Sequence, residues 1–322
     1  TLNQWLDVSF DYYHRDTKDM LMNVEYPDIL GTGAPDANAA DLRTKGWELA
    51  VNWRDRIGQD WSYGVQIALS DNQAEITKYD NPTGALSEYY EGEKIGEIWG
   101  YVTEGIFQTE EEVAQHADQS QIGANWRPGD IKYKDLNGDG VIDRGNNTLD
   151  NPGDRKIIGN NTARYSFGIS PDVTYKNWSL NLFFQGLFRD HLPGNGNWQA
   201  FYPFNAGHVE TWYLDETWSE DNPDAYFAAP HRSTSDKKNI QGQSRYVQNA
   251  AYIRLKNLRL SYNLPKSLLQ SINMSRAQIY VAGQNLWEAT GMHKPLDPEQ
   301  LDTNTQEYYF MRTVAVGVKL TF

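Results

Sequence analysis

Hydrophobic and polar residues alternate along the last stretch of the chain, residues 307–322. Every second position from Tyr308 is aromatic or aliphatic, except Arg312, and the positions between them are mostly small or polar. A period of two over so long a run predicts a β-strand whose two faces meet different surroundings. Strands of about 9–11 residues with an apolar band bordered by aromatic side chains are typical of a barrel wall that crosses a lipid bilayer.

Seven earlier stretches repeat this alternation. They lie near residues 2–13, 43–56, 61–70, 165–175, 178–185, 247–263 and 277–281. The alternation therefore predicts an all-β fold, an antiparallel transmembrane β-barrel segment with eight strands. The alternative is a soluble β-protein with long loops, in which the apolar face of each strand would pack against a second sheet.

The connections between these strands alternate between long and short. The long ones span about residues 23–42, 77–161, 190–246 and 291–305, and the short ones span about 57–60, 176–177 and 264–275. Outer-membrane barrels have short periplasmic turns and longer extracellular loops. We therefore expect residues 1–322 to form one barrel portion with extracellular long loops and a periplasmic C-terminus.

Composition fits narrow apolar bands joined by large hydrated loops. The chain contains 11 Trp, 20 Tyr and 11 Phe, yet its mean hydropathy is -0.70. It has no continuous apolar run long enough for a transmembrane helix, which takes about 20 residues. The net charge of -14 argues against a nucleic-acid partner, because phosphate binding needs a basic surface. Since the first residue, Thr1, already lies in a predicted strand, we expect the chain to be a piece of a longer protein.

The most specific local motif lies in the second long connection. Residues 135–143, with the sequence DLNGDGVID, match the first nine positions of an EF-hand calcium loop. Calcium takes six to eight hard oxygen ligands, and the glycine at the sixth position permits the sharp turn around the ion. The predicted calcium ligands are the side chains of Asp135, Asn137, Asp139 and Asp143 and the backbone carbonyl of Val141.

The twelfth position of this motif is Asn146 instead of the usual glutamate. A structural calcium ion would therefore need another ligand, such as Asp150 or Asp154, or water molecules. The alternative is an ordinary turn rich in Asn, Gly and Asp. In either case the loop is expected to act as a brace.

The sequence contains no recognisable catalytic set. Nucleophile elbows, HExxH motifs, P-loops and GxGxxG turns are absent, and the six His residues show no ligand spacing. Thr109 and Glu112 form a capping box, which predicts a short helix that ends near Ala117. We therefore predict a protein that is not an enzyme.

Aromatic residues gather in the third long connection, near residues 198–218. Such side chains could stack on sugar rings or hold peptide side chains, and they could equally pack the loop on itself. The candidate substrate-binding residues are Trp198, Phe201, Tyr202 and Trp212.

Short motifs along nearly the whole chain resemble the C-terminal portion of SusC/RagA-type TonB-dependent outer-membrane transporters of Bacteroidetes. Two departures from the family pattern are Ala163, where proline is usual, and Asn146 in the calcium-like loop. The matching stretches, in family order, are DYY (11–13), TKDML (17–21), KGWEL (45–49), GE (92–93), IWGY (98–101), EGIF (104–107), PGDIKYKD (128–135), IGN (158–160), RYSFG (164–168) and GQNL (283–286).

This resemblance implies a barrel of about 22 strands, of which the chain supplies the last eight. It also implies an N-terminal barrel and plug portion, which couples to TonB-ExbB-ExbD, and a SusD-like surface lipoprotein as a lid. The implied function is import of oligosaccharides or peptides across the outer membrane. Two alternatives are a self-contained passive or structural outer-membrane barrel and a secreted, calcium-braced glycan-binding β-protein.

Overall fold

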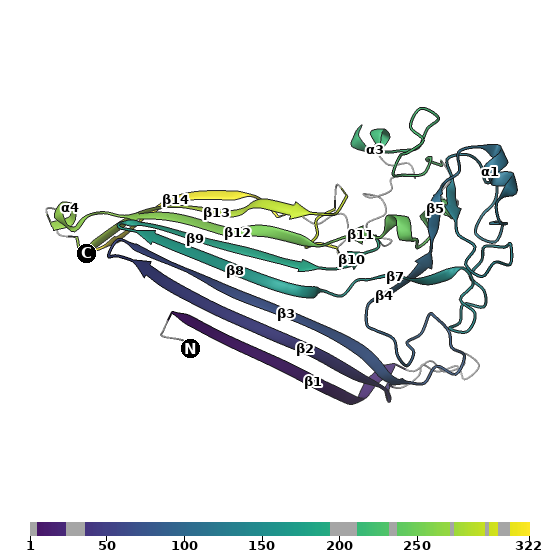
Figure 1. The fold of residues 1–322 in the computed structure, drawn as a ribbon, viewed down its shortest axis with the longest axis horizontal. Helices are drawn as coiled ribbons and strands as arrows, with labels where there is room; N and C mark the ends of the chain where they lie inside the picture. Colours follow the sequence, from purple (N-terminus) through teal and green to yellow (C-terminus); the bar gives the residue numbers. More distant parts are fainter. Residues whose placement is uncertain are drawn as a thin grey trace.

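Eight strands form one antiparallel sheet, and their order across the sheet follows their order along the chain: β1-β2-β3-β8-β9-β12-β13-β14 (Figure 1). The computed structural model describes residues 5–23, 36–193, 211–231, 237–270, 274–293, 296–301 and 310–322. The sheet strands are β1 (Leu6–Asn23), β2 (Asp36–Ile57), β3 (Trp61–Tyr79), β8 (Arg164–Tyr175), β9 (Trp178–Phe188), β12 (Tyr252–Asn263), β13 (Arg276–Thr290) and β14 (Thr313–Thr321).

One face of this sheet carries the apolar half of each strand, and we call it the apolar face. It holds large hydrophobic side chains that are exposed, including Val8, Phe10, Trp61, Tyr175, Trp178, Leu260, Ile279, Val281, Val314, Val316, Val318 and Leu320. Among the described residues, the sheet strands contact their hydrogen-bonded neighbours, and no second sheet packs on this face. The structure therefore confirms the predicted antiparallel barrel segment and argues against a two-sheet sandwich.

The sheet is open. Within the described part of the chain, β1 and β14 are the two edge strands and do not pair with each other. Eight strands that closed on themselves would have no such edges. This arrangement counts against a self-contained eight-stranded barrel.

Several strands differ in length from the prediction. At the end near the long connections, β1, β2 and β3 are longer than predicted. The added part of β1 contains a bulge between Thr17 and Leu21, where Asp19 has φ 55°. The last strand is shorter than expected, because Phe310–Arg312 is not in the ladder and only Thr313–Thr321 is. The pairing of β13 with β14 ends at Gln284 and Thr313, and the next residue of β13, Asn285, has φ 51°. This left-handed conformation interrupts the ladder.

The described parts of the connections that follow β3, β9 and β13 lie together at one end of the sheet, and we call them the loop layer (Figure 1). Short strands in it pair as β4 (Glu97–Tyr101) with β7 (Arg155–Asn160), β5 (Thr103–Ile106) with β6 (Ile131–Tyr133), and β10 (Asp190–His191) with β11 (Gln248–Asn249). Its helices are α1 (Glu110–Gln115), α3 (Thr211–Asp215), η2 (Lys238–Ile240) and η3 (Ser244–Tyr246). The opposite end holds the short connections, α4 (Lys266–Gln270) and the C-terminus (Figure 1).

The hydrophobic core lies in the loop layer. Its buried residues are Tyr101, Ile106, Ile131, Tyr133, Ile142, Tyr213, Phe227, Ala228 and Tyr246. The predicted capping box is confirmed at α1, where the Thr109 hydroxyl accepts a hydrogen bond from the Glu112 amide at 3.2 Å. In the described ranges, no helix is both long enough and apolar enough to span a membrane.

Candidate functional site

The face opposite the apolar face is lined by small and polar side chains, and we call it the groove face. One row across five neighbouring strands shows this clearly: Ser9, Ala50, Ala68, Gly168 and Gln185 are successive cross-strand partners. These side chains are short, so they leave space above the sheet.

The adjacent row points to the other face and is entirely apolar. Its successive cross-strand partners are Val8, Val51, Ile67, Ile169 and Phe184. Because successive residues of a strand point to opposite faces, one step along each strand changes the row from polar and small to large and apolar. The same sheet thus presents one face of large apolar side chains and one face of small and polar side chains.

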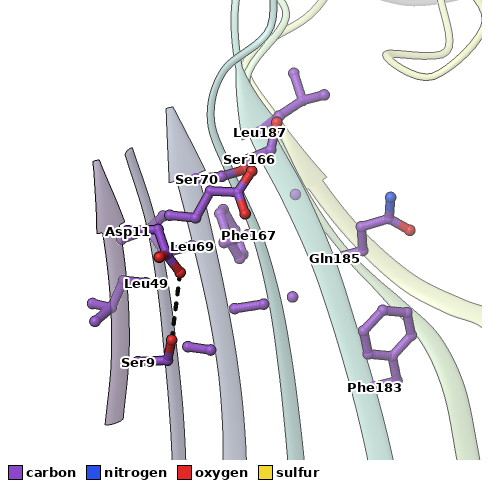
Figure 2. Close-up of a pocket in the computed structure, with 15 residues that line it drawn as sticks. Ser9, Asp11, Leu49, Leu69, Ser70, Ser166, Phe167, Phe183, Gln185 and Leu187 are labelled. Atoms are coloured by element: carbon purple, nitrogen blue, oxygen red, sulfur yellow. Dashed lines mark hydrogen bonds between the residues drawn. The ribbon is translucent and has the colours of Figure 1, made fainter. Parts of the chain in front are cut away.

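Two hollows of about 510 Å³ and about 520 Å³ lie on the groove face and share the row of small residues. Figure 2 shows Ser9 and Asp11 on one strand, with the Ser9 hydroxyl donating to the Asp11 carboxylate, and Phe183 and Gln185 on β9 across the hollow. Asp11 and Glu48 are direct cross-strand partners and both line the first hollow. These two carboxylates make this rim of the groove acidic. Like charges placed directly opposite each other destabilise a sheet, so the pair has an energetic cost.

The calcium-like loop folds as a series of tight side-chain-capped turns. The Asp135 carboxylate accepts hydrogen bonds from the amides of Gly138 at 2.6 Å and Gly140 at 2.9 Å. The Asn137 side-chain oxygen accepts from the Asp139 amide, and the Asp139 carboxylate accepts from the Val141 amide at 2.8 Å. The sequence motif therefore encodes a compact loop with its hard oxygen atoms on neighbouring turns.

Asp154 closes this loop. Its carboxylate is fully buried and accepts from the Leu136 amide at 2.7 Å and from the Asp143 amide at 2.9 Å, at the two ends of the motif. It therefore has a hydrogen-bonding role that sequence inspection did not identify. Asp143 itself accepts from the Gly145 amide at 2.7 Å.

The predicted ligand residues carry the kinds of oxygen atom that calcium binds, but their acidic side chains do not converge on one point. Oxygen atoms of carboxylates, an amide and a backbone carbonyl are the ligands that calcium takes. Across the described residues, however, no group of three acidic or histidine side chains converges as a metal-binding cluster. Any ion at this loop would depend on the carbonyl of Val141, the amide oxygen of Asn137 and water, in addition to the carboxylates.

A buried polar hub joins distant parts of the loop layer around Asp130. Its carboxylate accepts from His231 Nε2 at 2.6 Å, Lys238 Nζ at 2.8 Å and Asn239 Nδ2 at 2.8 Å, and from the Arg127 amide at 2.9 Å. Burial favours the neutral acid, but these donors outweigh it and hold the pKa of Asp130 below its usual value. The sequence placed Asp130 in a family-like motif and gave no sign of partners about a hundred residues away.

The loop layer also contains a cavity of about 530 Å³, at the junction of α3, β11 and the segment after β13. Of the four predicted substrate-binding residues, Trp212 lines this cavity, and Trp198, Phe201 and Tyr202 lie outside the described residues. Trp212 also packs on the loop core, with its ring centroid 6.1 Å from that of Phe227. Trp212 therefore packs on the loop core and also lines a cavity, and its role in substrate binding stays a prediction.

His293, Glu216, Tyr226 and Gln248 complete much of the cavity wall, and they were not singled out from the sequence. The Nε2 atom of His293 lies 2.5 Å from the Glu216 carboxylate. Burial lowers the pKa of His293 and the Glu216 charge opposes this shift, with burial the larger effect. The lowered pKa favours the neutral ring, and its Nε2 atom is positioned to donate a hydrogen bond to the Glu216 carboxylate.

No family model matches the chain. The curated proteins that it resembles are TonB-dependent receptors. TonB-dependent receptor P3 of Formosa agariphila is 29% identical over 343 aligned positions, which cover 98% of this chain and 32% of the relative. TonB-dependent receptor SusC of Bacteroides thetaiotaomicron is 24% identical, and the alignment covers 100% of this chain and 30% of SusC.

The same likeness holds in three dimensions. The solved structure of the RagAB peptide transporter superposes with a TM-score of 0.72 and 23% identity, over 99% of this chain and 33% of that chain. The RagAB peptide importer in its open-open state gives a TM-score of 0.71. The chain spans about a third of the length of these relatives. In sequence the chain is similar to part of SusC and other TonB-dependent receptors, and its fold is similar to part of the RagAB transporter, a partial β-barrel.

Proposed function

We propose that this chain forms part of the wall and outer loops of an outer-membrane transporter that imports oligosaccharides or peptides with energy delivered through TonB. The observation that carries this proposal is the pair of adjacent rows in the central sheet. The row from Val8 to Phe184 suits hydrocarbon, and the row from Ser9 to Gln185 suits a hydrated conduit. The relatives that share this fold are TonB-dependent receptors.

The proposed orientation follows from the distribution of connections. The loop layer would face the outside, and the short turns with the C-terminus would face the periplasm. A SusD-like lipoprotein would cover the loop layer, and the plug and remaining strands would come from the rest of the transporter. This segment would bind, enclose and guide the substrate without making or breaking bonds.

Transport is tested in cells that carry the whole transporter. Uptake of labelled oligosaccharide and peptide mixtures should require the transporter gene and should stop when a protonophore dissipates the proton-motive force. Co-purification with a surface lipoprotein should accompany uptake. Passive, protonophore-resistant uptake through the intact protein would contradict the proposal.

We also propose that the loop at residues 135–143 binds a structural calcium ion. Its oxygen-rich motif and its compact turns support this, and Asp154 holds the two ends of the loop together. Ion analysis of the purified transporter should find calcium that is lost in Asp139→Ala and retained in Asp118→Ala, an exposed acidic residue on the neighbouring segment. Wild-type protein without bound calcium would refute this site.

A further inference from the structure

The cavity in the loop layer combines an aromatic wall with a polar rim. The His293 ring lies 5.6 Å from the Trp212 ring and 4.6 Å from the Tyr226 ring, measured between centroids. All three side chains line the cavity. Its volume of about 530 Å³ falls within the usual range for small-molecule sites, about 300–1,000 Å³.

Hydrogen bonds from one side chain connect two of the three wall residues, Tyr226 and His293. Gln248 is buried and donates from its side-chain nitrogen to the Tyr226 hydroxyl at 2.8 Å, while its side-chain oxygen accepts from the His293 amide at 3.1 Å. One carboxamide therefore fixes the two loops that carry the rings. A preformed wall of this kind lowers the entropy cost of binding.

The charges at the cavity balance each other. Arg245 donates from Nε to the Tyr226 carbonyl and from Nη2 to the Ala225 carbonyl, each at 2.7 Å. The Glu216 carboxylate lies 2.5 Å from His293 Nε2, and burial lowers the pKa of His293, which favours the neutral ring. Among the described residues that line the cavity, Arg245 is the permanent cation and Glu216 is the carboxylate, so this lining offers no excess charge to offset the cost of desolvating an ionic ligand.

Hydrogen-bonding capacity remains at the rim. The Glu216 side chain is 39% exposed, and a carboxylate can accept more than one hydrogen bond. Asn249 is exposed at the end of β11 and carries a side-chain amide with two N–H groups. Apolar ring faces beside hydroxyl-binding groups match the C–H face and the hydroxyls of a sugar ring.

We propose that this cavity, walled by Trp212, Tyr226 and His293 and rimmed by Glu216 and Asn249, is a binding subsite for an uncharged sugar unit of an oligosaccharide. The inference rests on the proposed import function. Of the two substrate classes proposed there, oligosaccharides and peptides, it favours oligosaccharides. Charged peptides are the competing class, and the test separates the two.

The test uses the whole purified transporter and two probe sets. The first is a panel of neutral gluco-, manno-, galacto- and fructo-oligosaccharides, and the second is a panel of acidic, basic and neutral hexapeptides. At least one neutral oligosaccharide should bind. Trp212→Ala should weaken that binding about tenfold, because the stacking surface is lost. Trp212→Phe should retain most of it.

Charge dependence gives the second readout. Glu216→Gln removes the charge and one of the two acceptor oxygens, so oligosaccharide affinity should fall about threefold, whereas a cationic ligand should lose far more. Glu220→Gln, an exposed acid on the same segment that does not line the cavity, is the matched control. Asn249→Ala should weaken binding without disturbing the aromatic wall. This variant tests the subsite independently if Trp212→Ala misfolds.

Three results would overturn the subsite. They are binding of no neutral oligosaccharide, unchanged oligosaccharide affinity in both Trp212→Ala and Asn249→Ala, and binding of basic peptides that Glu216→Gln abolishes. Energy-dependent uptake by the wild-type transporter separates the two proposals. If that uptake persists while the subsite fails, import stands and the site of recognition lies elsewhere.

Discussion

At the scale of single residues, Asp154 has the largest predicted effect on the calcium-like loop. Its buried carboxylate is the acceptor for one amide at each end of the loop. Asp154→Ala leaves both N–H groups without this acceptor. Since a lost hydrogen bond to a charged group costs about 1.5–3 kcal/mol, the variant should lose roughly 3 kcal/mol or more of local stability.

Hydrogen exchange at the Leu136 and Asp143 amides measures this loss directly. Glu91→Gln, an exposed acid elsewhere in the same long connection, should change exchange little, because surface substitutions usually stay within about 0.5 kcal/mol. Unchanged protection of both amides in Asp154→Ala would show that the carboxylate does not close the loop.

The hub at Asp130 predicts acid sensitivity of the loop layer. Burial raises the pKa of Asp130, and the His231, Lys238 and Asn239 donors lower it by more, so the folded value lies below the unfolded one. Stability from this group is therefore fully present above pH 4 or so and is lost as the pH falls through the lowered value. Asp130→Asn should remove this part of the acid dependence.

Near-ultraviolet circular dichroism between pH 6 and pH 3 reports packing of the loop-layer aromatic residues. Asp130→Asn should also destabilise the layer at neutral pH by about 3–5 kcal/mol, because Lys238 stays buried without its carboxylate. Glu104→Gln at an exposed position is the charge-matched control. An acid profile identical in Asp130→Asn and wild type would exclude the hub as the cause.

At the scale of elements, the strands were predictable and the loop layer was not. Period-two alternation identifies a strand because each face of the sheet has its own surroundings, as in the rows through Val51 and Ala50. The capping box at Thr109 is equally local. The partners of Asp130 and the wall around Trp212 are set by contacts between segments far apart in the chain, which local patterns do not contain.

Another element fixed by long-range contacts is the segment 296–301, which Arg254 fastens to the sheet. The Arg254 side chain is only 5% exposed and contacts Glu288 on β13, Asp297 at 2.9 Å and Glu299 at 2.8 Å. Arg254→Met keeps the bulk and removes the cation, so Glu288 and Asp297 lose this partner while Glu299 keeps Lys256 at 2.5 Å. Breaking such a buried network costs about 3–5 kcal/mol.

Limited proteolysis of the whole transporter should then detect cleavage in residues 296–301 of Arg254→Met. Arg276→Lys, at an exposed position at the start of β13, should leave the segment protected. Equal resistance of Arg254→Met and wild type would mean that other contacts hold this segment in place.

At the scale of the whole molecule, the decisive property is the difference between the two faces of one sheet. Gln66 and Ile67 are consecutive residues of β3, so they lie at nearly the same depth in the proposed membrane. Gln66 points to the groove face and Ile67 points to the apolar face. A lysine in contact with the lipid midplane costs about 2–4 kcal/mol, whereas a lysine on the hydrated face costs little. Ile67→Lys should therefore reduce the folding free energy of the transporter in bilayers by about that amount, and Gln66→Lys by less than 1 kcal/mol or so. Denaturant unfolding in lipid vesicles measures both. Equal losses would mean that the apolar face does not meet hydrocarbon, and a larger loss in Gln66→Lys would reverse the assignment of the faces.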